Sequence, residues 1–241
     1  MKNIALIFAG GVGQRMNTVS LPKQFLKVHG KEIIIHTIER FQHCDLVDAI
    51  IVVCISNYID FLSRLIQQHN LNKVVKIVPG GSCGQISIFN GLVAAKEISN
   101  SDDDIVLIHD GVRPIIDSET IEKNIECVKH NGTAITVAKA HETILYSEND
   151  QGIGHALQRN NCYFGRAPQS FYLKDVFSCH LKSKEINKLD FIDTATMMDY
   201  FGYKLFPVLG PQNNIKVTTP MDFYFFKAIL DFKENEQINK L

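Results

Sequence analysis

The chain has 241 residues, of which 45% are hydrophobic, so it can bury a full core in one large α/β domain or two small ones. Its 25 basic and 26 acidic side chains are scattered, which argues against a nucleic-acid or anionic-membrane partner and requires any phosphate site to be local. No stretch approaches the roughly 18 apolar residues of a membrane span. The six cysteines form no CxxC pair, which predicts reduced thiols in a cytoplasmic protein.

Short apolar runs alternate with amphipathic segments along the first 140 residues. Runs rich in β-branched residues predict buried strands at 4–8, 49–55, 74–78, 105–109 and 134–138. Segments with apolar residues at helical spacing predict helices at 32–41, 57–69, 85–98 and 118–130. We therefore expect an α/β, Rossmann-like fold with a mainly parallel sheet and helices on both faces.

The rhythm changes at about 139–166, where polar residues interleave with short β-prone pieces and Gly152 and Gly154 break the pattern. This predicts an arm that protrudes from a single domain covering 1–241. Beyond the arm the pattern predicts two helices, a strand, a short β segment and a C-terminal helix, at 173–181, 193–201, 204–208, 214–217 and 219–233.

A glycine-rich loop directly follows the first predicted strand. Gly10, Gly11 and Gly13 lack a Cβ, so their backbone N–H groups can approach a bound anion, and Arg15 and Lys23 add positive charge just beyond them. The turns at 80–81 and 110–113 also follow strands. Because the carboxyl ends of parallel strands meet at one edge of a sheet, we expect all three turns to line one cleft.

The loop fails the two generic nucleotide motifs. A dinucleotide fingerprint needs a third glycine where Met16 stands, and Ile55-Ser56 supplies no acidic partner for a ribose at the end of the second strand. The Walker pattern is absent as well, because no Gly-Lys-Ser/Thr follows. A hydride-transfer enzyme therefore remains only as a weakened alternative to binding of a polyphosphate.

Five motifs occur in order along the chain: residues 9–16 with Pro22-Lys-Gln24, Gly80-Gly81 with Ser87, residues 109–114, Ala167-Pro-Gln169 and residues 214–218. Together they resemble the ordered motifs of the cytidylyltransferases that include the 2-C-methyl-D-erythritol 4-phosphate enzyme of isoprenoid synthesis and the ribitol-5-phosphate enzyme of surface-polymer synthesis. The resemblance covers residue 4 to about residue 229.

This resemblance implies a nucleotidyltransferase that moves CMP from CTP to a polyol phosphate, releases pyrophosphate, uses Mg²⁺ and works as a homodimer. It implies catalytic roles for three cations: Arg15 and Lys23 would bind the triphosphate, and Lys216 would support the α-phosphate from the other side. The implied CTP-binding residues, which surround the cytosine, ribose and phosphates, are Ala9, Gly10, Gly11, Gly13, Gly81 and Ser87.

For the acceptor, the resemblance implies that Asp110 lies beside the metal ion and the incoming polyol phosphate. Thr143 and Arg159 match arm residues that hold the acceptor phosphate, Arg159 across the dimer interface. Ile192 and Asp193 occupy the position of a Thr-Asp pair that cradles the acceptor in the methylerythritol enzymes.

The chemistry requires little covalent help, because a phosphate nucleophile is already ionised near pH 7 and needs mainly positioning and charge neutralisation. We therefore assign no histidine as a general base. His109 is expected to form structural hydrogen bonds at a strand end, and Arg113 to cap the same strand through an ion pair.

Three departures from the family pattern bear on the acceptor and on activity. Gly84 stands in place of an arginine, Ala167 in place of a threonine before Pro-Gln, and Ile192 in place of the cradle threonine. Losing one hydroxyl removes a hydrogen bond worth about 1 kcal/mol. These changes favour D-ribitol 5-phosphate, with 2-C-methyl-D-erythritol 4-phosphate as the alternative, while the loss of arginine at position 84 leaves open a nucleotide sensor without turnover.

Overall fold

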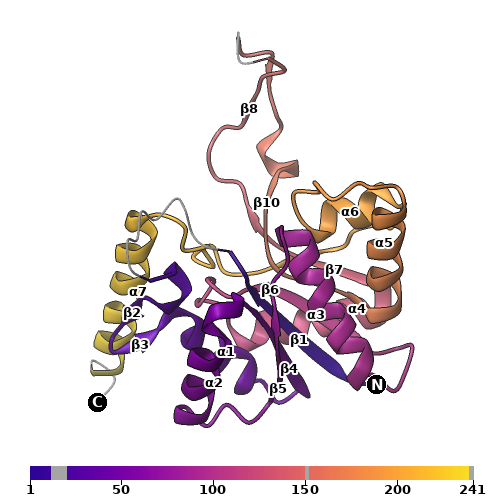
Figure 1. Cartoon of the computed structure of the whole chain (residues 1–241). Helices are drawn as coiled ribbons and strands as arrows, with labels where there is room; N and C mark the ends of the chain where they lie inside the picture. The colour runs from indigo at the N-terminus through magenta and orange to yellow at the C-terminus, as the bar shows by residue number, and fades with distance from the viewer. Residues whose placement is uncertain (12–20, 150–151, 239–241) are drawn as a thin grey trace.

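The computed structural model describes residues 1–11, 21–149 and 152–238. Within these residues one sheet has seven strands in the order β11-β7-β10-β6-β1-β4-β5. Every neighbouring pair is parallel except the two pairs that involve β10 (Figure 1). The strands are β1 (Asn3–Ala9), β4 (Ala49–Cys54), β5 (Val74–Pro79), β6 (Ile105–Asp110), β7 (Thr133–Lys139), β10 (Tyr163–Tyr172) and β11 (Pro207–Leu209). The mainly parallel α/β fold expected from the sequence is confirmed.

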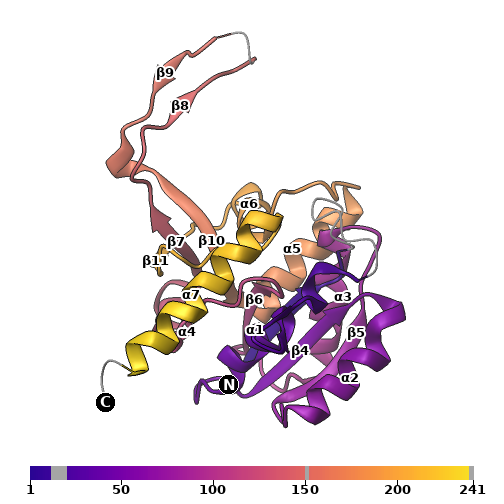
Figure 2. The ribbon, with the colours of Figure 1, turned by 90° about the vertical axis from the view of Figure 1, so that its left-hand side faces the viewer.

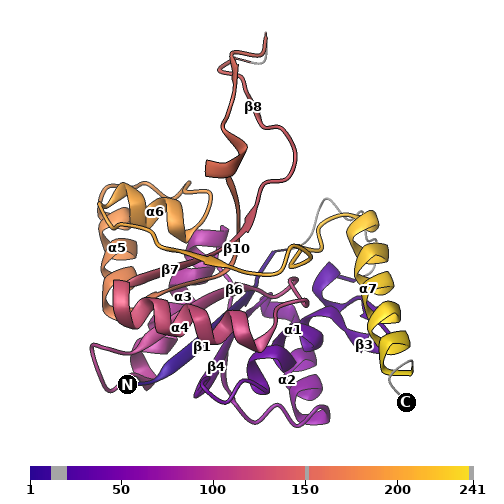
Figure 3. The same ribbon diagram turned by 180° about the vertical axis from the view of Figure 1, so that it is seen from behind.

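Helices cover both faces of this sheet because alternate residues of the central strands point in opposite directions. Ala5 and Ile7 of β1 pack with α1 (Ile33–Gln42), α2 (Ile59–Gln68) and α4 (Ser118–Asn131). Ile4 and Leu6 pack instead with α3 (Gly84–Ile98), α5 (Leu173–Glu185) and α6 (Thr194–Tyr200). The views from the front and from behind show these two layers (Figures 1 and 3).

A smaller core lies under the C-terminal helix α7 (Pro220–Ile238). There Phe226 packs with Val28 of β2 (Lys27–Val28) and with Val217, beside the short strand β3 (Lys31–Glu32). Single 3₁₀ turns occur at Lys23–Phe25, Ser56–Tyr58 and Arg159–Asn161. None of the helices in the described part of the chain has the length and apolarity needed to cross a membrane.

The predicted arm is present as a two-stranded extension that rises from the ends of β7 and β10 (Figure 2). Its strands are β8 (Leu145–Tyr146) and β9 (His155–Ala156), which pair antiparallel. The expected end of the arm at residue 166 falls inside β10, whose second half enters the middle of the sheet. Sequence reasoning missed this strand, which follows the arm without a break.

Two further expectations need correction. The late strand predicted at 204–208 is β11, at Pro207–Leu209. Residues 214–217, predicted as a β segment, form no strand; the Val217 N–H donates to the Val112 carbonyl at 2.9 Å, and the Asn214 amide donates to the Ala167 carbonyl at 2.8 Å. Isolated hydrogen bonds, rather than a ladder, therefore attach this segment to the end of β6 and to β10.

Candidate active site

The two glycine turns touch each other at the carboxyl edge of the sheet. A Cβ placed on Gly80 would lie 3.2 Å from the Cα of Gly10, and one on Gly10 would lie 3.0 Å from the hydroxyl oxygen of Ser87. A Cβ on Gly81 would overlap the side chain of Ile86 at 2.2 Å. A side chain at Gly81 would force Ile86 to shift, and one at Gly10 or Gly80 would require the facing turn to give way, so glycine lets these backbones approach closely.

Two buried polar side chains hold this arrangement. Gln24 donates from Nε2 to the carbonyl oxygens of Ala9 and Gly11, at 2.8 and 3.3 Å. The Ser87 hydroxyl accepts from the Gly81 N–H at 2.9 Å and donates to the Cys83 carbonyl at 2.9 Å. Sequence reasoning gave Gln24 no role of its own, although the Pro-Lys-Gln motif marked its position.

The turns open onto a pocket of about 530 Å³, which we call the glycine pocket. Lys23 and Lys216 lie on its wall. Of the predicted CTP-binding residues, five line it: Ala9, Gly10, Gly11, Gly81 and Ser87. Gly13 and Arg15, which were also predicted to bind CTP, lie outside the described residues.

A second pocket of about 510 Å³ lies on the α5 and α6 side, and we call it the arginine pocket because Arg113 and Arg166 line it. The predicted acceptor residues Ile192 and Asp193 are also on its wall. The two pockets share a common wall that consists of Phe8, Cys83, Gly84, Asp110 and Lys216. Ligands bound in the two pockets would therefore both lie next to Asp110 and Lys216.

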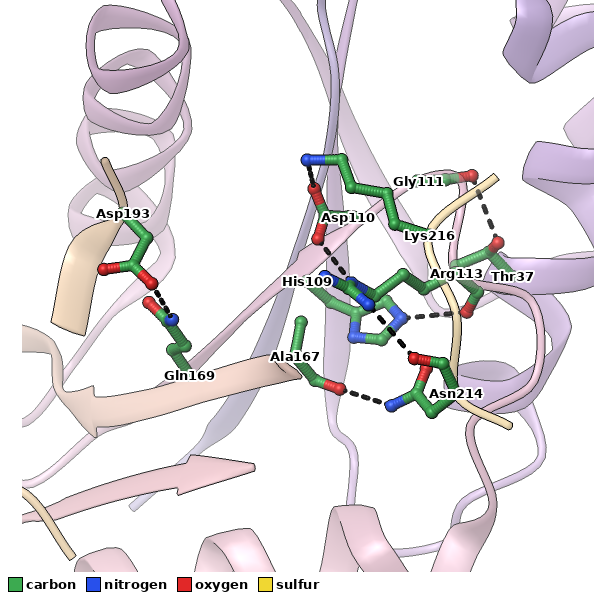
Figure 4. Close-up of polar contacts among 10 residues, drawn as sticks. All are labelled: Thr37, His109, Asp110, Gly111, Arg113, Ala167, Gln169, Asp193, Asn214 and Lys216. Atoms are coloured by element: carbon green, nitrogen blue, oxygen red, sulfur yellow. Dashed lines mark hydrogen bonds and ion pairs between the residues drawn. The ribbon is translucent and has the colours of Figure 1, made fainter. Parts of the chain in front are cut away.

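Asp110 carries the negative charge at this common wall (Figure 4). One carboxylate oxygen lies 2.7 Å from Nε of Arg113, and the other lies 2.5 Å from Nζ of Lys216. Burial would raise the pKa of this carboxyl, but the charges of Arg113 and Lys216 outweigh burial and lower the pKa to about 2. Asp110 is therefore ionised at neutral pH. The predicted ion pair of Arg113 is confirmed.

The segment 214–217 brings Lys216 to this point. Arg113 donates from Nη1 to the Asn214 carbonyl at 3.0 Å, while the Asn214 amide reaches the Ala167 carbonyl of β10 (Figure 4). Three stretches far apart in the chain are thereby tied around one carboxylate. Sequence reasoning did not assign Asn214 this function.

His109 is buried one residue before Asp110 and fits the structural role that was expected. Its Nε2 lies 3.0 Å from the Arg113 carbonyl oxygen. Burial lowers the pKa of His109 to about 4, so the imidazole is neutral at pH 7.

Gln169 connects β10 to the wall of the arginine pocket. Its Nε2 donates to the Asp193 carboxylate at 2.8 Å (Figure 4). Its Oε1 accepts from the Ala195 N–H at 2.9 Å. Asp193 also caps α6 by accepting from the Thr196 N–H at 2.8 Å. The neighbouring Ile192 is 93% exposed, so its side chain is open to a ligand.

The remaining predicted acceptor residues, Thr143 and Arg159, lie on the arm and line neither pocket. Both are exposed, and Arg159 donates to the His141 carbonyl at 3.1 Å. Within one chain, the structure therefore does not bring them to the acceptor residues at the end of α6.

For a metal ion, Asp110 is the one acidic side chain on the described wall of the glycine pocket. No cluster of three His, Cys, Asp or Glu side chains suited to a metal occurs in the described part of the chain. Mg²⁺ commonly uses one or two carboxylates together with substrate phosphates and water, so a single carboxylate beside a phosphate pocket suits it.

The fold and the paired pockets define a class: an α/β protein that presents glycine turns and cations to a phosphate-bearing ligand at the carboxyl edge of its sheet. The family follows from the sequence. The model of the 2-C-methyl-D-erythritol 4-phosphate cytidylyltransferase family matches residues 3–232, and the chain belongs to that family.

Individual relatives refine this assignment. The chain is 49% identical over 238 residues, 99% of both chains, to a ribitol-5-phosphate cytidylyltransferase of Streptococcus agalactiae. It is 39% identical over 218 residues, covering 90% of this chain and 94% of the relative, to a 2-C-methyl-D-erythritol 4-phosphate cytidylyltransferase of Clostridium botulinum. A solved structure of 4-diphosphocytidyl-2C-methyl-D-erythritol synthase from Anaerococcus prevotii matches with a TM-score of 0.81 at 25% identity, covering 95% of this chain and 96% of that one.

Proposed function

We propose that this protein transfers CMP from CTP to D-ribitol 5-phosphate, giving CDP-ribitol and pyrophosphate. The observation that carries the proposal is the common wall of the two pockets, where Asp110 and Lys216 face both. A reaction that joins two phosphates needs two adjacent pockets with cations at their junction.

In this proposal CTP occupies the glycine pocket. The loop of Gly10 and Gly11 offers its backbone to the phosphates, and Lys23 and Lys216 supply positive charge. Arg15 belongs to the same proposed set. Ala9, Gly81 and Ser87 would surround the cytosine and ribose.

Lys216 would hold the α-phosphate at the junction while an oxygen of the acceptor phosphate attacks it in line. The new P–O bond forms as the bond to pyrophosphate breaks, so charge shifts toward the leaving group and the cations stabilise it. Asp110 orients Lys216 and Arg113, to both of which it is bound. The bound Mg²⁺, which Asp110 would help to hold, supplies further charge neutralisation.

Ribitol 5-phosphate is preferred over methylerythritol phosphate for two reasons. The relatives named for ribitol 5-phosphate are 44–49% identical, against 39% for the methylerythritol enzyme described above. In addition, Ala167 and Ile192, both on the wall of the arginine pocket, lack the two threonine hydroxyls typical of methylerythritol enzymes.

We further infer a homodimer built through the arm. Apolar side chains along the arm and at its base are exposed in the single chain: Leu145, Tyr146, Ile153, Leu157, Tyr163 and Phe164. A partner that covers them would remove this surface from water and would bring an Arg159 towards the other chain's arginine pocket. The six free thiols support a cytoplasmic location.

The test is a pyrophosphate-release assay with CTP, Mg²⁺ and a panel of polyol phosphates. We expect the highest kcat/KM with D-ribitol 5-phosphate. A higher kcat/KM with 2-C-methyl-D-erythritol 4-phosphate would favour the isoprenoid enzyme, and CTP binding without turnover on any acceptor would contradict both and favour a nucleotide sensor.

A further inference from the structure

Arg166 is a cation of the arginine pocket for which the protein supplies no counter-ion. It lies in β10, half-buried, and its Nε is shielded from water with no hydrogen-bond acceptor among the described residues. Its guanidinium carbon stands 5.6 Å from the ring centre of Phe164, a contact that stabilises a cation without neutralising it.

The acidic side chains on the wall of this pocket are all engaged elsewhere. Asp110 binds Arg113 and Lys216, and Asp193 caps α6 and accepts from Gln169. Asp190 lies 3.5 Å from the ammonium group of Lys188. No ion pair in the described part of the chain includes Arg166.

The surroundings of Arg166 also oppose its positive charge. Burial lowers the pKa of Arg166, and the nearby charge of Arg113 lowers it further, although a guanidinium keeps its proton at neutral pH. At this end of the pocket three cations, Arg113, Arg166 and Lys216, are present with the single carboxylate of Asp110 between two of them. The local excess of positive charge favours an anionic ligand.

The position of Arg166 indicates which anion this is. Arg166 lines the arginine pocket and is absent from the wall of the glycine pocket, whereas Lys216 and Asp110 are on both. An anion that contacts Arg166 therefore belongs to the ligand of the arginine pocket. The planar fork of a guanidinium matches two oxygens of a phosphate.

We propose that Arg166 binds the phosphate of the acceptor, a polyol phosphate. This inference rests on the proposed function, and it assigns to the acceptor site a residue that the sequence motifs did not indicate. The bound phosphate would supply the missing counter-ion beside Arg113, at the side of the pocket that meets the glycine pocket.

The test compares Arg166→Gln and Arg166→Lys with Arg64→Gln, an exposed arginine of α2 that lines neither pocket. Arg166→Gln should raise the KM for D-ribitol 5-phosphate at least about tenfold, the size expected for one charge-assisted hydrogen bond, and leave the KM for CTP within about threefold. Arg166→Lys should lie between Arg166→Gln and the wild type. The control should match the wild type.

Stability separates binding from a structural role. If Arg166 only stacks on Phe164, Arg166→Gln lowers the Tm and leaves the two KM values in their original ratio, which overturns the proposal. If the charge of Arg166 has a counter-ion only when an anion is bound, removal of this charge leaves the Tm of the ligand-free protein unchanged or raises it. An equal rise in both KM values would also overturn the proposal.

A binding experiment tests the anion site at Arg166 independently of which polyol phosphate is the acceptor. Inorganic phosphate is titrated calorimetrically into CTP-saturated wild-type protein and into Arg166→Gln, with no acceptor present. A loss of affinity of at least about tenfold in Arg166→Gln supports the anion site even if no polyol phosphate is turned over. Equal affinities overturn it, whatever the enzyme assay shows.

Discussion

At the scale of single residues, the two lysines on the wall of the glycine pocket come from opposite ends of the chain. Lys23 follows the glycine loop, and Lys216 belongs to the segment that Asn214 ties to β10. Lys216 also lies 2.5 Å from Asp110, so its ammonium group is held in position before a substrate arrives. Such preorganised charge is the main contribution that a protein makes to phosphoryl transfer.

We expect Lys23→Ala and Lys216→Ala each to lower kcat at least about a hundredfold, the effect of removing one preorganised charge from the site. Steady-state pyrophosphate release provides the measurement. Lys96→Ala, at an exposed position of α3 outside both pockets, is the matched control. Near-normal turnover in either site variant would show that another cation performs this role.

Two buried histidines should make the protein sensitive to acid. Burial lowers the pKa of His109 and of His180 to about 4, from 6.5. Below pH 6.5 the unfolded chain takes up protons that the folded chain excludes, so stability falls as the pH drops from 6.5 towards 4 and then levels off. Each histidine accounts for about 2 kcal/mol of this loss at pH 5.

We therefore expect His180→Leu to reduce the loss of unfolding free energy between pH 7.5 and pH 5 by about 2 kcal/mol, because Leu cannot take up the proton. Urea unfolding at both pH values gives the difference. The exposed His43 offers a control as His43→Leu, which should leave the loss at its wild-type size. An unchanged pH dependence in His180→Leu would contradict the burial argument.

Sequence reasoning located several site residues but missed the side chains that hold them. Asp110 and Gly81 follow apolar runs that predict strands, so the order of residues along the chain was enough to place both at the carboxyl edge of the sheet. Gln24, Asn214 and Gln169 act on backbone groups from other elements, at distances of 2.8 to 2.9 Å. Such partners are set by the tertiary fold and leave no local periodicity.

At the scale of elements, the strand of the seven-stranded sheet that escaped prediction is β10. Its sequence contains Gly165 and Pro168, and a proline argues against a central strand because it has no N–H for the ladder. The structure resolves this conflict with a shift in register between Gly165 and Gln169, which takes Pro168 out of the ladder. The peptide bond before Pro168 is cis.

Helix α3 offers a matched pair of glycines for testing how closely it packs on the sheet. A Cβ on Gly91 would lie 2.8 Å from side-chain atoms of Leu6 and Val53, whereas one on Gly84 would meet open space. Gly91→Ala should therefore lower the unfolding free energy by about 1–3 kcal/mol, despite the higher helix propensity of alanine. Gly84→Ala should leave it unchanged or raise it. Urea unfolding distinguishes the two, and equal effects would contradict this packing.

At the scale of the whole molecule, the alternation of strands and helices up to residue 138 could be predicted because most of the apolar runs are buried on both faces. The run at 74–78, expected as a buried strand, is only partly buried, because β5 is an edge strand of the sheet and Val75 is 50% exposed. The arm was also recognised, from its loss of pattern. The antiparallel return through β10 could not be predicted, since its first half, beside β7, is mostly exposed and its second half is mostly buried. The first half of β10 therefore lies in an exposed environment and the second half in a buried one.

Leu145→Asp combined with Ile153→Asp should convert the proposed dimer into a monomer, because both exposed apolar side chains lie on the arm that would form the interface. Sedimentation equilibrium measures the mass. If Arg159 acts across that interface, the KM for the acceptor should also rise in the monomer by a larger factor than the KM for CTP, each relative to the wild type. A wild-type protein that is already monomeric would exclude the arm from this role.

The wall common to the two pockets also governs the order of events during turnover. Because Asp110 and Lys216 line both pockets, substrates bound in the two pockets would contact the same two side chains, and we expect the nucleotidyl group to pass directly from one substrate to the other. The protein need not carry it covalently in between. Initial-rate plots should intersect, as in a sequential mechanism, and a molecule that joins a cytidine diphosphate to a polyol should compete with both substrates at once.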